Sequence, residues 1–174
     1  FLKEEESWGI DAAFEWYYDE ASLFSVTVFH REIDNVISES NSKVDGSLYS
    51  DSAEPGELWD LAAFGNGKDG ELQGLEISIN ARMDNYIDGF FSGFGASLNV
   101  ALIESEYTTP EGKVFALPGQ SDTNYNASVF YEDHGFSARL TYRYRSEWLD
   151  ETETGAVFNL GGGVYWAAQN RLDA

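Results

Sequence analysis

The segment WGIDAAFEWYY, residues 8–18, alternates between apolar and polar side chains and decides the fold class. Its even positions are apolar and mostly aromatic: Trp8, Ile10, Ala12, Phe14, Trp16 and Tyr18. Its odd positions include the carboxylates of Asp11 and Glu15. Because successive side chains of a β-strand point to opposite faces, the segment predicts a strand with one apolar face. A strand of about ten residues or more with an aromatic-ended apolar face is typical of an outer-membrane β-barrel.

The same alternation recurs along the chain. It predicts strands over residues 6–18, 22–37, 71–83 and 90–106, around residues 124–132 and 136–145, and a seventh strand that begins at Arg171. The predicted fold is all-β: an antiparallel transmembrane β-barrel, of which residues 1–174 form a partial wall of about six strands plus the start of a seventh. Bacterial barrels have an even number of strands, at least about eight, so the chain is expected to be part of a larger barrel.

Short and long connections alternate between these strands. Short turns are predicted at residues 19–21, 84–88 and 133–135, and longer loops at residues 38–69 and 147–170, with a loop of intermediate length before residue 124. Outer-membrane barrels have short periplasmic turns and longer extracellular loops. The first strand is therefore expected to run from the cell surface toward the periplasm.

The net charge of the 174-residue chain is −21, and much of it lies in the long connections. A surface of this sign repels phosphates, which disfavours nucleic-acid binding. Two interpretations of the acidic loops remain open: solvated surface, or binding of divalent cations within residues 38–69 or 147–153. The apolar runs are shorter than the ~18–20 residues of a membrane-spanning helix. The chain has no cysteine, which excludes disulfides and thiolate metal sites.

Five segments resemble the C-terminal barrel of TonB-dependent outer-membrane receptors. They are KEEESWGI (3–10), FHREIDNVI (29–37), LQGLE (72–76), LPGQS (117–121) and YRYRS (142–146). The resemblance implies a barrel of about 22 strands, with an N-terminal plug domain and final strands outside this chain. It also implies active import of a scarce nutrient across the bacterial outer membrane, with energy from the TonB complex. Ferric siderophores, haem, cobalamin, metals and oligosaccharides are substrates of the family, and no motif in this chain selects one.

Two groups of residues are candidate sites. Charged side chains predicted to face the lumen could contact the plug domain, pair with each other or meet an anionic substrate: Arg82, Glu132, Arg139, Arg143 and Arg145. Aromatic side chains in the predicted loops could stack on a ligand or pack within the loops: Tyr49, Trp59, Phe64, Trp148 and Phe158. A further aromatic set is expected to face lipid as interfacial anchors: Trp16, Tyr18, Tyr142 and Tyr144.

The sequence indicates a transporter, and no enzyme, cofactor or metal site is expected. His30 and His134 are about a hundred residues apart and lack a set of partner ligands. Carboxylates such as Glu104 and Glu106 stand at a strand end with no nucleophile nearby. The alternatives are a passive porin, a structural surface barrel or, in a different class, a soluble β-sandwich that binds carbohydrate.

Overall fold

The computed structural model describes residues 1–152 and 162–174; Phe158 lies outside the described residues. The described chain is built from antiparallel β-strands: β1 (Glu6–Asp19), β2 (Ser22–Asp34), β3 (Ile37–Asp45), β4 (Leu58–Asn66), β5 (Gly70–Arg82), β6 (Phe94–Thr108), β7 (Val114–Phe115), β8 (Thr123–Asp133), β9 (Phe136–Arg145), β10 (Trp148–Thr152), β11 (Gly163–Trp166) and β12 (Gln169–Asp173). Two short 3₁₀ helices, η1 (Gly46–Leu48) and η2 (Gly89–Gly93), complete the elements.

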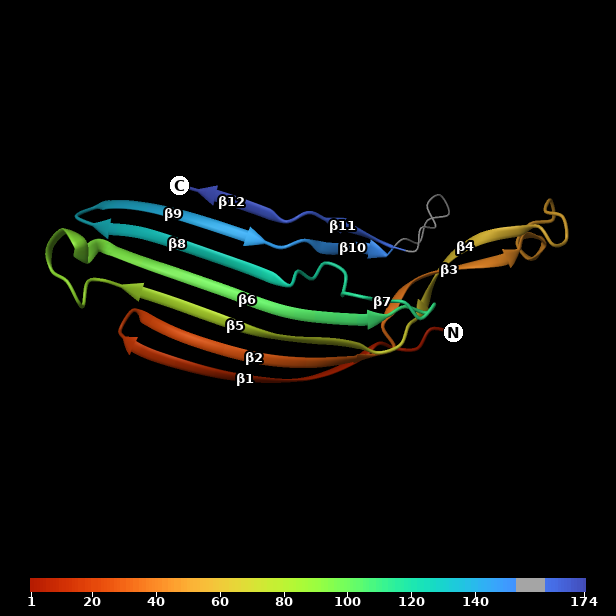
Figure 1. Ribbon diagram of the computed structural model, residues 1–174, viewed down its shortest axis with the longest axis horizontal. Coiled ribbons are helices and arrows are strands. Elements are labelled where there is room, and N and C mark those ends of the chain that lie inside the picture. Colours follow the sequence, from red (N-terminus) through yellow and green to blue (C-terminus); the bar gives the residue numbers. More distant parts are fainter. Residues whose placement is uncertain (153–161) are drawn as a thin grey trace.

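One large sheet has the strand order β1-β2-β5-β6-β8-β9-β12, and β7 pairs with the end of β6. Each strand is antiparallel to its neighbour, and the sheet is not closed within the chain. The turns β1–β2, β5–β6 and β8–β9 lie at one end, and the longer connections at the other (Figure 1). This arrangement confirms the predicted wall of six strands and the start of a seventh.

The register of the sheet confirms the two faces predicted from the period of two. Phe14 pairs with Val26, which pairs with Ile77, which pairs with Val100, so one face carries a row of apolar side chains. Beside Trp8, polar side chains end this apolar face where the long connections begin: His30, Glu32, Glu71, Gln73, Glu104 and Glu106. The opposite face carries mainly polar and charged residues.

The apolar face has no second layer packed on it within the described residues. The exposed fraction is 61% for Phe14, 50% for Val28 and 49% for Leu140. The buried apolar cluster is small and lies under the long connections, where Val36, Tyr107 and Leu149 meet. The main strands are 10 to 15 residues long. A soluble β-sandwich buries its apolar faces between two sheets of shorter strands, so that alternative is wrong.

The turns follow the prediction at two of three positions. His134 and Gly135 both have positive φ, 51° and 78°, as a two-residue hairpin turn with this twist requires. The β5–β6 connection is longer than the predicted 84–88, because residues 89–93 form η2 and β6 begins at Phe94 instead of residue 90. Phe90 packs against Tyr131 and Phe94, with ring centroids 4.9 and 5.9 Å apart, and these contacts hold the turn back onto the sheet.

The predicted loop at 38–69 is wrong in detail, because it contains the hairpin β3–β4. Strand β2 ends at Asp34 instead of residue 37, since Asn35 adopts a φ of 57° and redirects the chain. The hairpin projects beyond the end of the sheet (Figure 1). The predicted loop at 147–170 likewise contains the paired strands β10 and β11. No helix among the described residues has the length and apolar character needed to cross a membrane.

Candidate functional site

The polar face of the sheet is the candidate site, and the predicted charged residues are spread along it from the turn end to the opposite end. One row of directly paired positions crosses all seven strands without an apolar side chain: Glu15, Ser25, Ser78, Asn99, Asn126, Arg143 and Arg171. Within it the Ser78 hydroxyl donates to Oδ1 of Asn99 at 2.5 Å. A cavity of about 470 Å³ lies along these strands, lined among others by Ser25, Glu76, Asn99 and Arg143.

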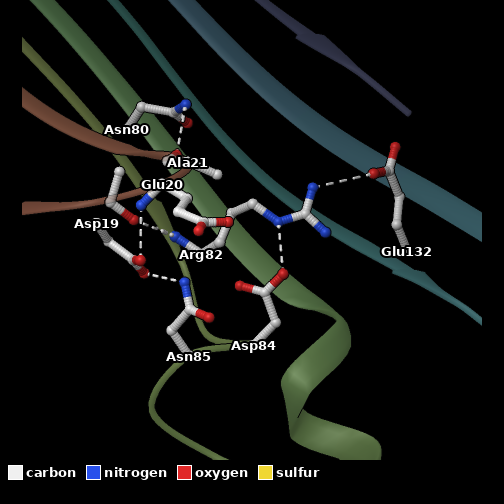
Figure 2. A network of polar contacts seen from close by, with 9 residues as sticks. Asp19, Glu20, Ala21, Asn80, Arg82, Asp84, Asn85 and Glu132 are labelled. Carbon is white, nitrogen blue, oxygen red and sulfur yellow. Dashed lines mark hydrogen bonds and ion pairs between the residues drawn. The ribbon is translucent and has the colours of Figure 1, made fainter. Parts of the chain in front are cut away.

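Arg82 and Glu132 form an ion pair between β5 and β8. The Arg82 guanidinium lies 3.6 Å from a carboxylate oxygen of Glu132, and its Nε donates to Asp84 at 3.2 Å (Figure 2). Side-chain exposures of 31% for Arg82 and 46% for Glu132 leave the pair partly in solvent. Arg82 therefore has local partners on the wall itself.

The same region ties the short turns to one another (Figure 2). The Asn85 amide donates to a carboxylate oxygen of Asp19, which links the β5–β6 turn to the end of β1. Asn80 donates from Nδ2 to the carbonyl of Ala21 at 3.3 Å. The Arg82 backbone N–H donates to the Ser22 hydroxyl at 3.2 Å. This network holds two hairpins in register at the turn end of the sheet.

The guanidinium groups of Arg139 and Arg145 also contact other groups of the chain. The Arg139 guanidinium lies 4.9 Å from the ring centre of Phe130. The Arg145 guanidinium lies 3.8 Å from the ring centre of Trp148, and its Nε donates to the Ser121 hydroxyl at 2.7 Å. It also donates to the Gly119 carbonyl. Arg145 therefore joins the end of β9 to the connection at 109–122.

Arg143 differs from the other predicted lumen charges. Within the described part of the chain its side chain has no hydrogen bond, ion pair or ring contact, whereas the side chains of Arg82, Glu132, Arg139 and Arg145 each have at least one. It pairs across the sheet with Asn126 on one side and Arg171 on the other.

The predicted loop aromatics do not form one platform. Tyr49, Trp59 and Phe64 belong to the β3–β4 hairpin, and Trp148 belongs to β10. Trp59 and Phe64 stand on opposite faces of the hairpin, because they are an odd number of residues apart on β4. The Trp59 indole packs over Gly46 and donates to Glu57 at 3.0 Å, which is a packing role inside the hairpin.

Sequence reasoning missed two residues of the site. Trp166 stacks on Trp148 with ring centroids 6.1 Å apart and planes at 18°. Arg171 faces Arg143 across β9 and β12. The only available signal for Arg171 was its place at the start of the seventh strand, two positions from Asp173 on the same face.

The predicted membrane anchors lie where the alternation placed them. Trp16, Tyr142 and Tyr144 share the apolar face through their cross-strand partners Phe24, Ala127 and Tyr125. A shift of register near Tyr18 lets its hydroxyl donate to the Asn80 carbonyl at 3.0 Å, while its ring packs on Trp16 at 5.4 Å. The residues that the structure describes contain no group of three or more His, Asp or Glu side chains that could hold a metal ion.

Comparisons with known proteins agree with this geometry. The sequence matches the family described as TonB dependent receptor-like, beta-barrel, over residues 1–174. Its structure is similar to that of the FrpB iron transporter from Neisseria meningitidis (F3-3 variant), with a TM-score of 0.57 at 14% sequence identity. The similarity covers 97% of this chain and 24% of FrpB, so the chain spans about a quarter of that protein's length. None of the curated proteins matches the sequence. The match over the whole chain shows that it belongs to the TonB-dependent receptor-like β-barrel family.

Proposed function

We propose that this chain forms part of the barrel wall of a TonB-dependent receptor that actively imports a scarce nutrient across the bacterial outer membrane. The observation that carries the proposal is the family match over residues 1–174. The two faces of the sheet support it, because an exposed apolar face suits contact with lipid and a polar face suits a barrel lumen. The family is one of transporters and receptors, and the chain is proposed to have no catalytic activity.

The proposal includes partners that lie outside these residues. They are an N-terminal plug domain in the lumen, the TonB complex on the periplasmic side and the nutrient itself. FrpB is named as an iron transporter, which makes iron complexes one class to test beside siderophores, haem, cobalamin and oligosaccharides. Arg82, Glu132, Arg139, Arg143 and Arg145 are proposed to line the lumen, and Trp148 is proposed to lie near the extracellular entrance.

An uptake assay in the native host tests this proposal. Cells with and without the receptor gene take up radiolabelled candidates from each class, in a background with or without a functional TonB complex. Energised import predicts that uptake of one candidate is lost both without the receptor and without TonB. Uptake that depends on the receptor but persists without TonB would instead establish the alternative, a passive porin. If uptake of every candidate is the same with and without the receptor gene, the result would favour a structural surface barrel.

A further inference from the structure

The arginines and the lysines of this chain lie in different parts of the fold. All of them lie in strands of the large sheet and share its polar face: Arg31, Arg82, Arg139, Arg143, Arg145 and Arg171. All the lysines lie outside that sheet, at positions 3, 43, 68 and 113. In a chain with a net charge of −21, this places a local excess of guanidinium groups on β9 and β12. Guanidinium suits bidentate binding of carboxylate and phosphate better than ammonium does.

Arg143 and Arg171 stand directly opposite each other across β9 and β12. Side chains at such positions have Cβ atoms about 4.5–5.5 Å apart, and like charges there are destabilising. Arg171 pairs with Asp173 at 2.7 Å, but Arg143 has no partner within the described residues. The charged groups nearest in register are Arg145 and Asp173, each one step along the same face. Within the described residues the pair, together with Asp173, therefore carries a net positive charge.

The arginine pair lies beside a hollow with a polar lining. A hollow of about 630 Å³ is lined by Arg143, Arg145, Gln169 and Arg171, together with parts of residues 144, 168 and 170. Asn126 lies next to Arg143 on β8, and its Oδ1 is shielded from solvent and accepts no hydrogen bond. Arg145 also lines the hollow, contacts Trp148 and Ser121, and adds a third positive charge to its wall.

We infer that Arg143 and Arg171 form a binding site for a carboxylate or phosphate group of a hydrophilic solute that enters the lumen. A carboxylate or phosphate group between the two guanidiniums accepts charge-assisted hydrogen bonds from both and reduces their mutual repulsion. The acidic extracellular connections do not prevent this, because their field is screened within about 8 Å at physiological ionic strength. The inference rests on the proposed function, since it requires the polar face to line the lumen, and it assigns an anionic class to the solute.

Binding of small dianions to the purified full-length protein tests the inference. Succinate and inorganic phosphate are the probes, titrated by calorimetry against chloride of equal ionic strength. Arg143→Gln and Arg171→Gln each remove one guanidinium and keep a polar side chain of similar length. Arg31→Gln is the matched control, because Arg31 lies on the same face of β2, away from the arginine pair.

The wild-type protein and Arg31→Gln are expected to bind at least one probe with equal affinity. Each of the other two variants is expected to weaken binding about tenfold or more. Absence of probe binding by the wild-type protein, or equal loss in Arg31→Gln, would overturn the inference. Unchanged probe binding with a lowered thermal midpoint in Arg143→Gln would also overturn it, and would assign the pair to a carboxylate of the protein itself. No step of this test requires energised transport, so its failure leaves the uptake assay unaffected.

Discussion

Gly67 lies where the chain returns from the β3–β4 hairpin to the sheet. Its N–H donates to the Val36 carbonyl at 2.8 Å, and the next N–H, of Lys68, donates to the Thr108 carbonyl at 2.9 Å. A Cβ added at Gly67 would lie 2.1 Å from the Thr108 carbonyl oxygen. Because that oxygen belongs to the backbone, it cannot move aside as a side chain would.

Gly67→Ala is therefore expected to destabilise the folded barrel by about 2 kcal/mol or more. The measurement is the fraction of full-length protein that migrates as folded barrel on an unboiled gel, followed over temperature. Gly162→Ala is the matched control, since a Cβ there meets no atom of the described residues within 4 Å. Equal thermal midpoints for the two variants would contradict the close approach at Thr108.

Arg145 connects two segments of the chain, β10 and the connection at 109–122. Its guanidinium binds Ser121 and Gly119 and covers the Trp148 ring. Arg145→Lys keeps the positive charge but removes the planar guanidinium and its contacts. This loss is expected to lower the free energy of local opening of residues 109–122 by about 1–2 kcal/mol. Limited proteolysis of the full-length protein should then cut within 109–122 at a higher rate. Arg139→Lys is the control, and faster cleavage in both variants would argue against a specific connector.

Among the elements, the β3–β4 hairpin depends on polar contacts at its tip. Asp45 accepts hydrogen bonds from the N–H and hydroxyl of Ser47, at 3.0 and 2.7 Å, and from the N–H of Gly56 at 3.1 Å. These hydrogen bonds lower the pKa of the Asp45 carboxyl below its ordinary value, and the bond from the Ser47 hydroxyl contributes most. A lowered folded-state pKa means that the carboxylate stabilises the tip at neutral pH. This contribution is lost as pH falls through the folded pKa.

The protection of the Ser47 and Gly56 amides against hydrogen exchange is expected to follow this titration. In the wild-type protein it should fall as pH drops below about 4, after correction for the intrinsic exchange rate. Asp45→Asn should have lower protection at neutral pH and little change across the same window. Asp51→Asn, which removes a nearby exposed carboxylate, should behave like the wild type. A pH-independent wild-type protection would show that Asp45 does not hold the tip.

On the scale of the whole molecule, the arrangement of the two faces determines which positions tolerate charge. Leu98 pairs with Ile79 and Ala127 on the apolar face, whereas Asn99 pairs with Ser78 and Asn126 on the polar face. Leu140 lies on the apolar face two strands away from Leu98, next to Val129. An arginine on the lipid face near the bilayer midplane costs roughly 2–4 kcal/mol in barrels.

Leu98→Arg and Leu140→Arg are therefore expected to lower the amount of assembled barrel clearly, and Asn99→Arg to lower it less. The measurement is the amount of folded protein in outer-membrane fractions of cells that express each variant. The order of the three yields is the informative quantity, because expression differences affect all of them. Equal yields for Leu98→Arg and Asn99→Arg, or the reverse order, would mean that the lipid and lumen faces are exchanged.

The long strands and their two faces were predictable from the sequence because they depend on local periodicity alone. The alternation in residues 8–18 requires no knowledge of a neighbour, and a hairpin turn such as His134-Gly135 sets the register of the strands beside it. The β3–β4 hairpin was not predictable in this way. Its first strand, β3, is rich in Ser, its second strand, β4, lacks a regular alternation of apolar and polar residues, and their pairing adds stability that composition does not reveal.

The sequence by itself determined that Arg139, Arg143 and Arg145 share a face, because positions an even number apart on a strand point the same way. It also placed Arg82 on the polar side of its own strand, because Leu75, Ile77 and Ile79 occupy the other side. Only the tertiary structure decided which of them have partners. Trp148 reaches Arg145 through the bend after β9, and Arg171 faces Arg143 after a connection of more than twenty residues. Where a long connection returns to a sheet depends on its own packing and its partners, and residue periodicity carries no information about either.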